Sequence, residues 1–77
     1  MTTTTTAPAD IKAGDRVYEQ VGASNFATFE VESAEMGVTR TGRVIWTYHG
    51  YRNVNAGVSG PNCFSLVEGE TVEVITV

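Results

Sequence analysis

Alternating apolar and polar positions between Phe26 and Tyr48 are the strongest pattern in this chain. They form two runs, FATFEVESAEM and RTGRVIWTY, separated by Gly37. Successive side chains of a strand point to opposite faces of a sheet, so this alternation predicts two antiparallel strands that share one dry face. No credible amphipathic helix accompanies them. The chain is therefore expected to be all-β.

The dry face is expected to carry every second residue of these two runs. We expect Gly37 and its neighbours to reverse the chain, and Trp46 to be the central core residue. The residues predicted on the core face are Ala27, Phe29, Val31 and Ser33 on the first strand and Val44, Trp46 and Tyr48 on the second.

Turn residues divide the remaining sequence into shorter strands. Gly14 and Asp15 predict a turn before an edge strand at 16–21, and a tight turn at 68–70 separates strands at 63–67 and 71–77. A further short strand is expected near 51–54. Residues 1–10 contain five threonines and no apolar anchor, so we expect a disordered tail followed by a single domain at 11–77.

A flat sheet of five or six short strands leaves its dry face uncovered and its edges open, so the sheet is expected to curl on itself. The predicted fold is a small, strongly bent antiparallel barrel or roll. Its corners are expected at five glycines, Gly22, Gly37, Gly42, Gly50 and Gly69.

The segments IKAGDRVYEQ and LVEGETVEV resemble the first strand and the closing hairpin of SH3-like barrels. Together they cover about a quarter of the chain and imply a fold, because SH3-like barrels serve many functions. In its threonine- and alanine-rich start, small size and mild acidity, the chain is also similar to short accessory proteins of actinobacterial phages. That similarity implies a phage-encoded protein acting in the host cytoplasm.

Composition narrows the class of protein. The 77 residues are 42% hydrophobic and 18% charged, which is typical of a folded globular domain. A formal net charge of −4 disfavours non-specific binding to nucleic acid. The single cysteine, Cys63, excludes an internal disulfide, and no apolar run is long enough to span a bilayer. We expect a cytoplasmic protein without a membrane partner.

Catalytic and metal chemistry find little support in the residue types present. Cys63 and His49 form the only possible nucleophile and base, and nothing in the sequence brings them together. One Cys and one His are too few for a zinc site. Glu30 and Glu32 share a strand face and are interpreted as a solvated surface. We expect no enzyme activity, no metal and no cofactor.

A mixed surface of arginine, tyrosine and asparagine is the best candidate for binding. Residues 50–62 are rich in Gly, Asn and Ser and predict a long loop, which is where binding residues concentrate. Arg and Tyr are enriched at protein interfaces. The residues expected to contact a partner are Arg43, His49, Tyr51, Arg52, Asn53 and Asn55.

These observations favour a non-enzymatic protein-binding module, such as an accessory protein or inhibitor acting on a host protein. One alternative is a single-stranded nucleic-acid-binding domain, because the segment 40–52 mixes Arg40, Arg43 and Arg52 with aromatic residues. The other is a structural subunit of a larger phage assembly, with strand edges pairing between copies. The protein itself is expected to be a monomer or a homodimer.

Overall fold

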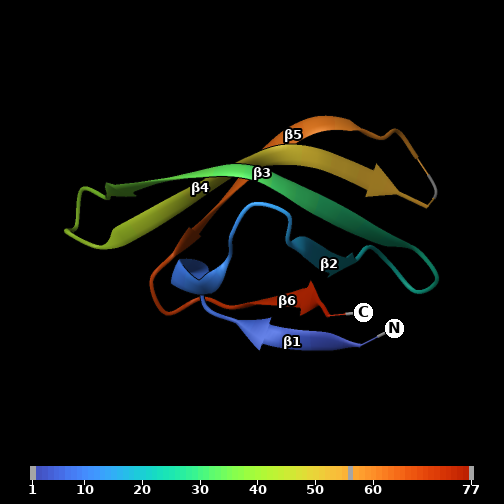
Figure 1. The fold of residues 1–77 in the computed structure, drawn as a ribbon, viewed down its shortest axis with the longest axis horizontal. Coiled ribbons are helices and arrows are strands. Elements are labelled where there is room, and N and C mark those ends of the chain that lie inside the picture. Colours follow the sequence, from blue (N-terminus) through green and yellow to red (C-terminus); the bar gives the residue numbers. More distant parts are fainter. Residues whose placement is uncertain (1, 56, 77) are drawn as a thin grey trace.

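The computed structural model describes residues 2–55 and 57–76, which form one antiparallel sheet (Figure 1). Met1, Ala56 and Val77, which belong to the expected tail, loop and last strand, lie outside the described residues. The strand order is β1-β6-β2-β3-β4-β5. The elements are β1 (Thr3–Thr6), the short 3-10 helix η1 (Pro8–Asp10), β2 (Arg16–Gln20), β3 (Phe26–Val38), β4 (Val44–Val54), β5 (Gly60–Val67) and β6 (Val72–Ile75). The predicted all-β class is confirmed.

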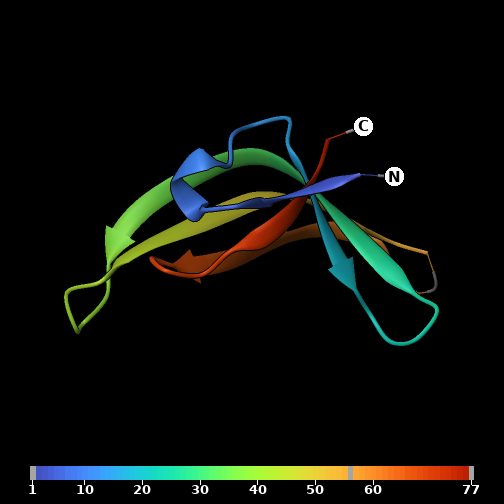
Figure 2. The same cartoon turned by 90° about the horizontal axis from the view of Figure 1, so that it is seen from below.

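The sheet is strongly curved but does not close into a barrel (Figure 2). Its two outermost strands are β1 and β5, and these are not paired with each other. β6 follows β5 in the chain but pairs with β2 along one side and with β1 along the other, so β1 and not β6 forms the edge on that side of the sheet. Of the expected barrel or roll, the closed barrel is therefore not formed, and the fold is an open, curved sheet.

The hydrophobic core lies on the concave face and follows the predicted alternation. Ala27, Phe29 and Val31 are buried as expected, whereas Ser33 is exposed. Ser33 departs from the pattern because the register between β3 and β4 shifts between Val31 and Ser33. This irregularity moves the residues of β3 by one position, so that even-numbered residues face the concave side beyond it.

Gly50 accommodates the closest approach of β3 to β4. A Cβ atom at this position would overlap the carbonyl oxygen of Glu30 and lie 3.1 Å from Cε1 of Phe29. Gly50 is therefore required by packing inside β4, and it sits beside the register shift where the long strands bend. Of the other expected corners, Gly22, Gly42 and Gly69 have positive φ and do lie between strands.

The reversal between the two long strands occurs later than expected. Gly37 pairs with Ile45 inside β3, and the turn spans residues 39–43, where the Thr39 amide donates to the Arg43 carbonyl. The prediction that the chain reverses at Gly37 is therefore wrong. Gly42, with φ of 84°, supplies the left-handed residue that the turn needs.

Tyr48, not Trp46, is the central aromatic residue of the core. Tyr48 is 0% exposed, whereas Trp46 is partly buried and packs against the core cluster. The difference follows from position along β4, because Trp46 lies opposite the exposed Met36 while the Tyr48 side chain lies under η1. There its hydroxyl donates a 2.7 Å hydrogen bond to the Pro8 carbonyl.

The amino-terminal segment is ordered where a disordered tail was expected. Thr3–Thr6 forms β1 and pairs in register with β6, and the hydroxyls of Thr3 and Thr5 donate to the two carboxylate oxygens of Glu73. Threonine is β-branched and favours strands, so backbone pairing compensates for the missing apolar anchor. In consequence β2, expected at an edge, lies between β6 and β3.

We predict that Gly50→Ala destabilises the fold by about 1–3 kcal/mol, because the added methyl group overlaps a rigid carbonyl and crowds an aromatic ring. Urea unfolding followed by circular dichroism measures this change. Gly60→Ala is the matched control, since a Cβ there meets no atom within 4 Å, and it is expected to change stability by less than about 0.5 kcal/mol. Equal stability of the two variants would contradict the packing role.

A second prediction concerns alkaline pH. Burial raises the pKa of the Tyr48 phenol above its ordinary value. Above about pH 10 the unfolded chain releases this proton while the folded chain keeps it, so the free energy of unfolding falls as pH rises. Tyr48→Phe is expected to weaken that fall, at a cost of about 1 kcal/mol for the lost hydrogen bond to Pro8. Urea midpoints of both proteins, measured from neutral to alkaline pH, test this, and parallel curves would refute it.

Candidate functional site: a recess on the concave face

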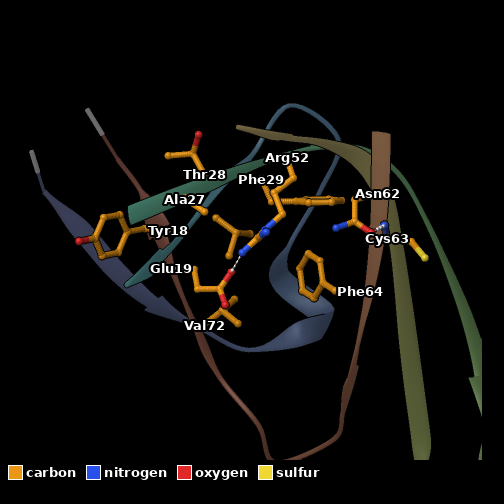
Figure 3. A pocket seen from close by; sticks show the side chains of 11 residues that line it. Tyr18, Glu19, Ala27, Thr28, Phe29, Arg52, Asn62, Cys63, Phe64 and Val72 are labelled. Carbon is orange, nitrogen blue, oxygen red and sulfur yellow. Dashed lines mark hydrogen bonds and ion pairs between the residues drawn. The ribbon is translucent and has the colours of Figure 1, made fainter. Parts of the chain in front are cut away.

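A recess of about 280 Å³ opens on the concave face between β5 and the β2–β6 side of the sheet (Figure 3). Its lining is mainly apolar, and an ion pair lies at its mouth. The lining includes the apolar side chains of Val17, Phe29, Phe64 and Val72 and the charged side chains of Glu19 and Arg52. They come from five different strands, so only the curved sheet assembles them.

Strand register explains why these residues meet. Val17 pairs with Phe29, and Phe29 pairs with Arg52, which places the three side chains in one row across β2, β3 and β4. Phe64 on β5 closes the row from the other side. Its ring packs edge-on against Phe29 with centroids 4.8 Å apart, and lies 5.0 Å from the ring of Tyr48. The apolar part of the recess is thus continuous with the core.

The ion pair at the mouth is weakly held. Nη2 of Arg52 donates to Oε2 of Glu19 at 3.1 Å, and the two side chains are 33% and 62% exposed. Exposed pairs of this kind contribute about 0–1 kcal/mol, because water screens them. Both charged groups can therefore exchange their intramolecular contact for a contact with a bound partner.

The size of the recess limits what it can hold. Sites for small-molecule ligands and cofactors usually measure about 300–1,000 Å³. A volume of about 280 Å³ lies at the lower limit of that range, and it also suits one or two protein side chains. The recess thus has the dimensions of a pocket for an anchor residue from another protein.

The residues expected to bind a partner do not form one surface. His49, Tyr51 and Asn53 are odd-numbered residues of β4 and face the convex side, whereas Arg52 faces the concave side and lines the recess. Neighbouring residues of a strand point in opposite directions, so Tyr51 and Arg52 cannot contact the same partner surface. Among these strand residues, only Arg52 belongs to the recess.

Arg43 and Asn55 have structural contacts at the two ends of β4. Nη2 of Arg43 donates to the Glu68 carbonyl at 2.6 Å, which ties the turn before β4 to the turn after β5. Oδ1 of Asn55 accepts a hydrogen bond from the Phe26 amide at 2.9 Å. These contacts hold both side chains against the protein's own backbone.

The long loop expected at 50–62 is mostly strand. β4 continues to Val54 and β5 begins at Gly60, so the connection is reduced to residues 55–59. The polar side chains that predicted a loop instead close a hairpin, since Oγ of Ser59 accepts a hydrogen bond from the Val54 amide at 3.0 Å. The Asn- and Gly-rich composition therefore predicted a longer loop than the structure has.

The basic and aromatic residues on which the nucleic-acid alternative rests lie in different parts of the structure. Arg40 and Arg43 lie in the turn at one end of β4 and Arg52 near its other end, a separation of about 30 Å along a strand. Tyr48 is buried in the core and cannot stack on a base. The basic and aromatic residues of this segment are thus dispersed.

Cys63 and His49 are closer than the sequence indicated. They are paired residues of β5 and β4, so both side chains face the convex side, and Figure 3 shows the Cys63 sulfur pointing away from the recess. Nε2 of His49 lies 2.7 Å from Oε1 of Glu35. Within residues 2–55 and 57–76, no group of three or more His, Cys, Asp or Glu side chains is arranged to hold a metal ion.

Of the residues that line the recess, the sequence analysis named only Arg52 as a binding residue. Val17 and Phe29 were recognised as strand residues, but their pairing across β2, β3 and β4 was not predictable from alternation. Glu19 carried a usable signal, since it shares the face of Val17 on a strand with period two. For Phe64 the sequence contained no signal of a binding role other than its apolar side chain.

In comparisons with known proteins, no protein-family model, no curated protein and no solved structure matches this chain. In the part of the chain that the structure describes, no helix is long and apolar enough to cross a membrane.

Proposed function

We propose that this chain is a non-enzymatic protein-binding module that docks on its partner through the concave recess. The observation that best supports this proposal is an apolar pocket of side-chain size with the Arg52–Glu19 ion pair at its mouth. Interfaces derive most of their binding energy from a few anchor side chains that fill such pockets, and arginine is enriched among the contributing residues.

The chemistry of the recess indicates the kind of segment that binds. Phe29, Phe64 and Val72 offer an apolar wall for one large aliphatic or aromatic side chain. The carboxylate of Glu19 is the more exposed member of the ion pair, and the whole chain carries a formal net charge of −4. We therefore infer a partner segment that combines an apolar anchor with a neighbouring lysine or arginine.

The resemblance to SH3-like barrels concerns the fold of this chain. The first segment lies beside the end of the second, because Val17 of β2 pairs with Val74 of β6. The second segment is not the closing hairpin that the resemblance implies, since β5 and β6 are not paired with each other. We propose that the fold is an opened relative of such a barrel, with β1 added along β6. This relationship supports the fold only, since function depends on the site.

The opposite orientations of Tyr51 and Arg52 give a direct test. We predict that Arg52→Ala weakens partner binding by about tenfold or more, because it removes a polar contact at the pocket mouth. Tyr51→Ala is the matched control on the convex face and is expected to retain binding. The measurement is co-purification on the immobilised full chain, with partner identification by mass spectrometry and titration of the identified protein against both variants.

Three results would refute the proposal. Binding lost in Tyr51→Ala and kept in Arg52→Ala would move the site to the convex face. Capture that returns no protein, together with a shift of labelled single-stranded RNA or DNA that weakens steeply with salt, would support the nucleic-acid alternative. Equal binding by both variants and the wild type would exclude both surfaces. Circular dichroism of each variant confirms that the fold is intact.

A further inference from the structure

The second half of β3 forms an open edge of the sheet. β2 pairs with β3 only from Phe26 to Glu30, and in the described residues the segment Ser33–Val38 pairs with β4 alone. Every residue of that segment is exposed. Figure 1 shows it as part of an arm that projects from the sheet and ends in the β3–β4 turn. No other described element covers this edge.

The hydrogen-bonding groups on the open edge can be assigned from the ladder. The Thr39 amide donates to the Arg43 carbonyl across the turn. Antiparallel pairs alternate between hydrogen-bonded and non-hydrogen-bonded, so Gly37, Glu35 and Ser33 direct their amides and carbonyls toward β4. Ala34, Met36 and Val38 direct theirs outward, where they are available to another strand.

Apolar side chains accompany these free backbone groups. Met36 and Val38 are each 71% exposed, and both lie on the concave face beside their partners Trp46 and Val44. Natural edge strands are usually protected by proline, lysine or a covering element. The segment Ser33–Val38 contains neither proline nor lysine, and its one charged residue, Glu35, lies on the face opposite to Met36 and Val38. An extended apolar edge of this kind is a template for strand addition.

We propose that this edge binds a second copy of the same chain, with the two β3 strands antiparallel about a two-fold axis at Met36. In this register Met36 faces its own counterpart, and Ala34 faces Val38 of the other copy. Glu32 of each copy then lies beside Arg40 of the other, which is in the β3–β4 turn two residues beyond the end of the strand. The interface is isologous, so this contact between opposite charges forms twice. The concave faces of the two arms join into one apolar strip.

Charge selects this register over its neighbours. An alternative register must keep each side chain on the same face of the sheet, so the pairing can shift only by two residues at a time. In a symmetric pair, a shift of two residues moves the two-fold axis by one residue. Moving the axis to Glu35 places two glutamates opposite each other, and moving it to Ala34 or Gly37 leaves Glu32 without a basic partner. Neither Glu32 nor Arg40 is in an ion pair within residues 2–55 and 57–76. The proposal is independent of the recess, which lies on the far part of the sheet.

Charge reversal tests the proposal. Sedimentation velocity of the full chain across micromolar to millimolar concentrations is expected to show a monomer–dimer equilibrium. Glu32→Arg and Arg40→Glu are each expected to raise the dimer dissociation constant about tenfold or more, because each sets like charges against each other twice. The double variant Glu32→Arg, Arg40→Glu is expected to restore dimerisation. Val58→Arg, at an exposed loop position at the opposite end of the molecule, is the control and leaves the equilibrium unchanged.

A disulfide test checks the position of the axis. Hydrogen-bonded antiparallel pairs have Cα atoms about 5.5 Å apart, within the range that a disulfide spans. In a Cys63→Ser background, Met36→Cys is expected to form a covalent dimer on mild oxidation. Val38→Cys is expected not to, because its partner is Ala34. A wild-type chain that stays monomeric, a double variant that does not recover, or equal cross-linking at both positions would each overturn the proposal.

Discussion

The long pairing of β3 with β4 is the constraint on which the rest of the molecule depends. It joins 13 residues to 11 and contains the register shift between Val31 and Ser33. Gly50 permits this irregularity, because a larger residue would meet the Glu30 carbonyl. The bend that results turns two strands into the shared wall of a concave core. The recess and the buried position of Tyr48 both follow from it.

Alternate residues of β4 point to opposite faces of the sheet, so the candidate binding side chains on this strand are divided between two surfaces. Tyr51 and its odd-numbered neighbours occupy the convex side, whereas Arg52 turns inward beside Phe29 and Phe64. A sequence segment that mixes arginine and tyrosine thus supplies two unrelated surfaces. The inward surface has depth and an apolar lining, which are the properties that allow a small domain to bind another protein strongly.

The strands of the sheet differ in how well their edges are covered by neighbouring strands. β6 is protected on both sides, by β2 and by the threonine-rich β1, whose hydroxyls also bind the Glu73 carboxylate. Among residues 2–55 and 57–76 no element covers the outer half of β3, and its exposed Met36 and Val38 lie next to backbone groups that pair with no described strand. A domain of 77 residues buries a small core, so an association that covers this edge adds stability that the chain alone lacks.

The sequence by itself determined the all-β class, the dry face of β3 as far as Val31 and the position of the tight turn near Gly69, because alternation and turn residues act locally. It misjudged the turn at Gly37, the length of the loop after Gly50 and the order in Thr3–Thr6. Those features depend on hydrogen bonds between residues far apart in the chain. Only the tertiary structure decided that Arg52 meets Glu19 and that the barrel stays open, since register and strand order are set by long-range pairing.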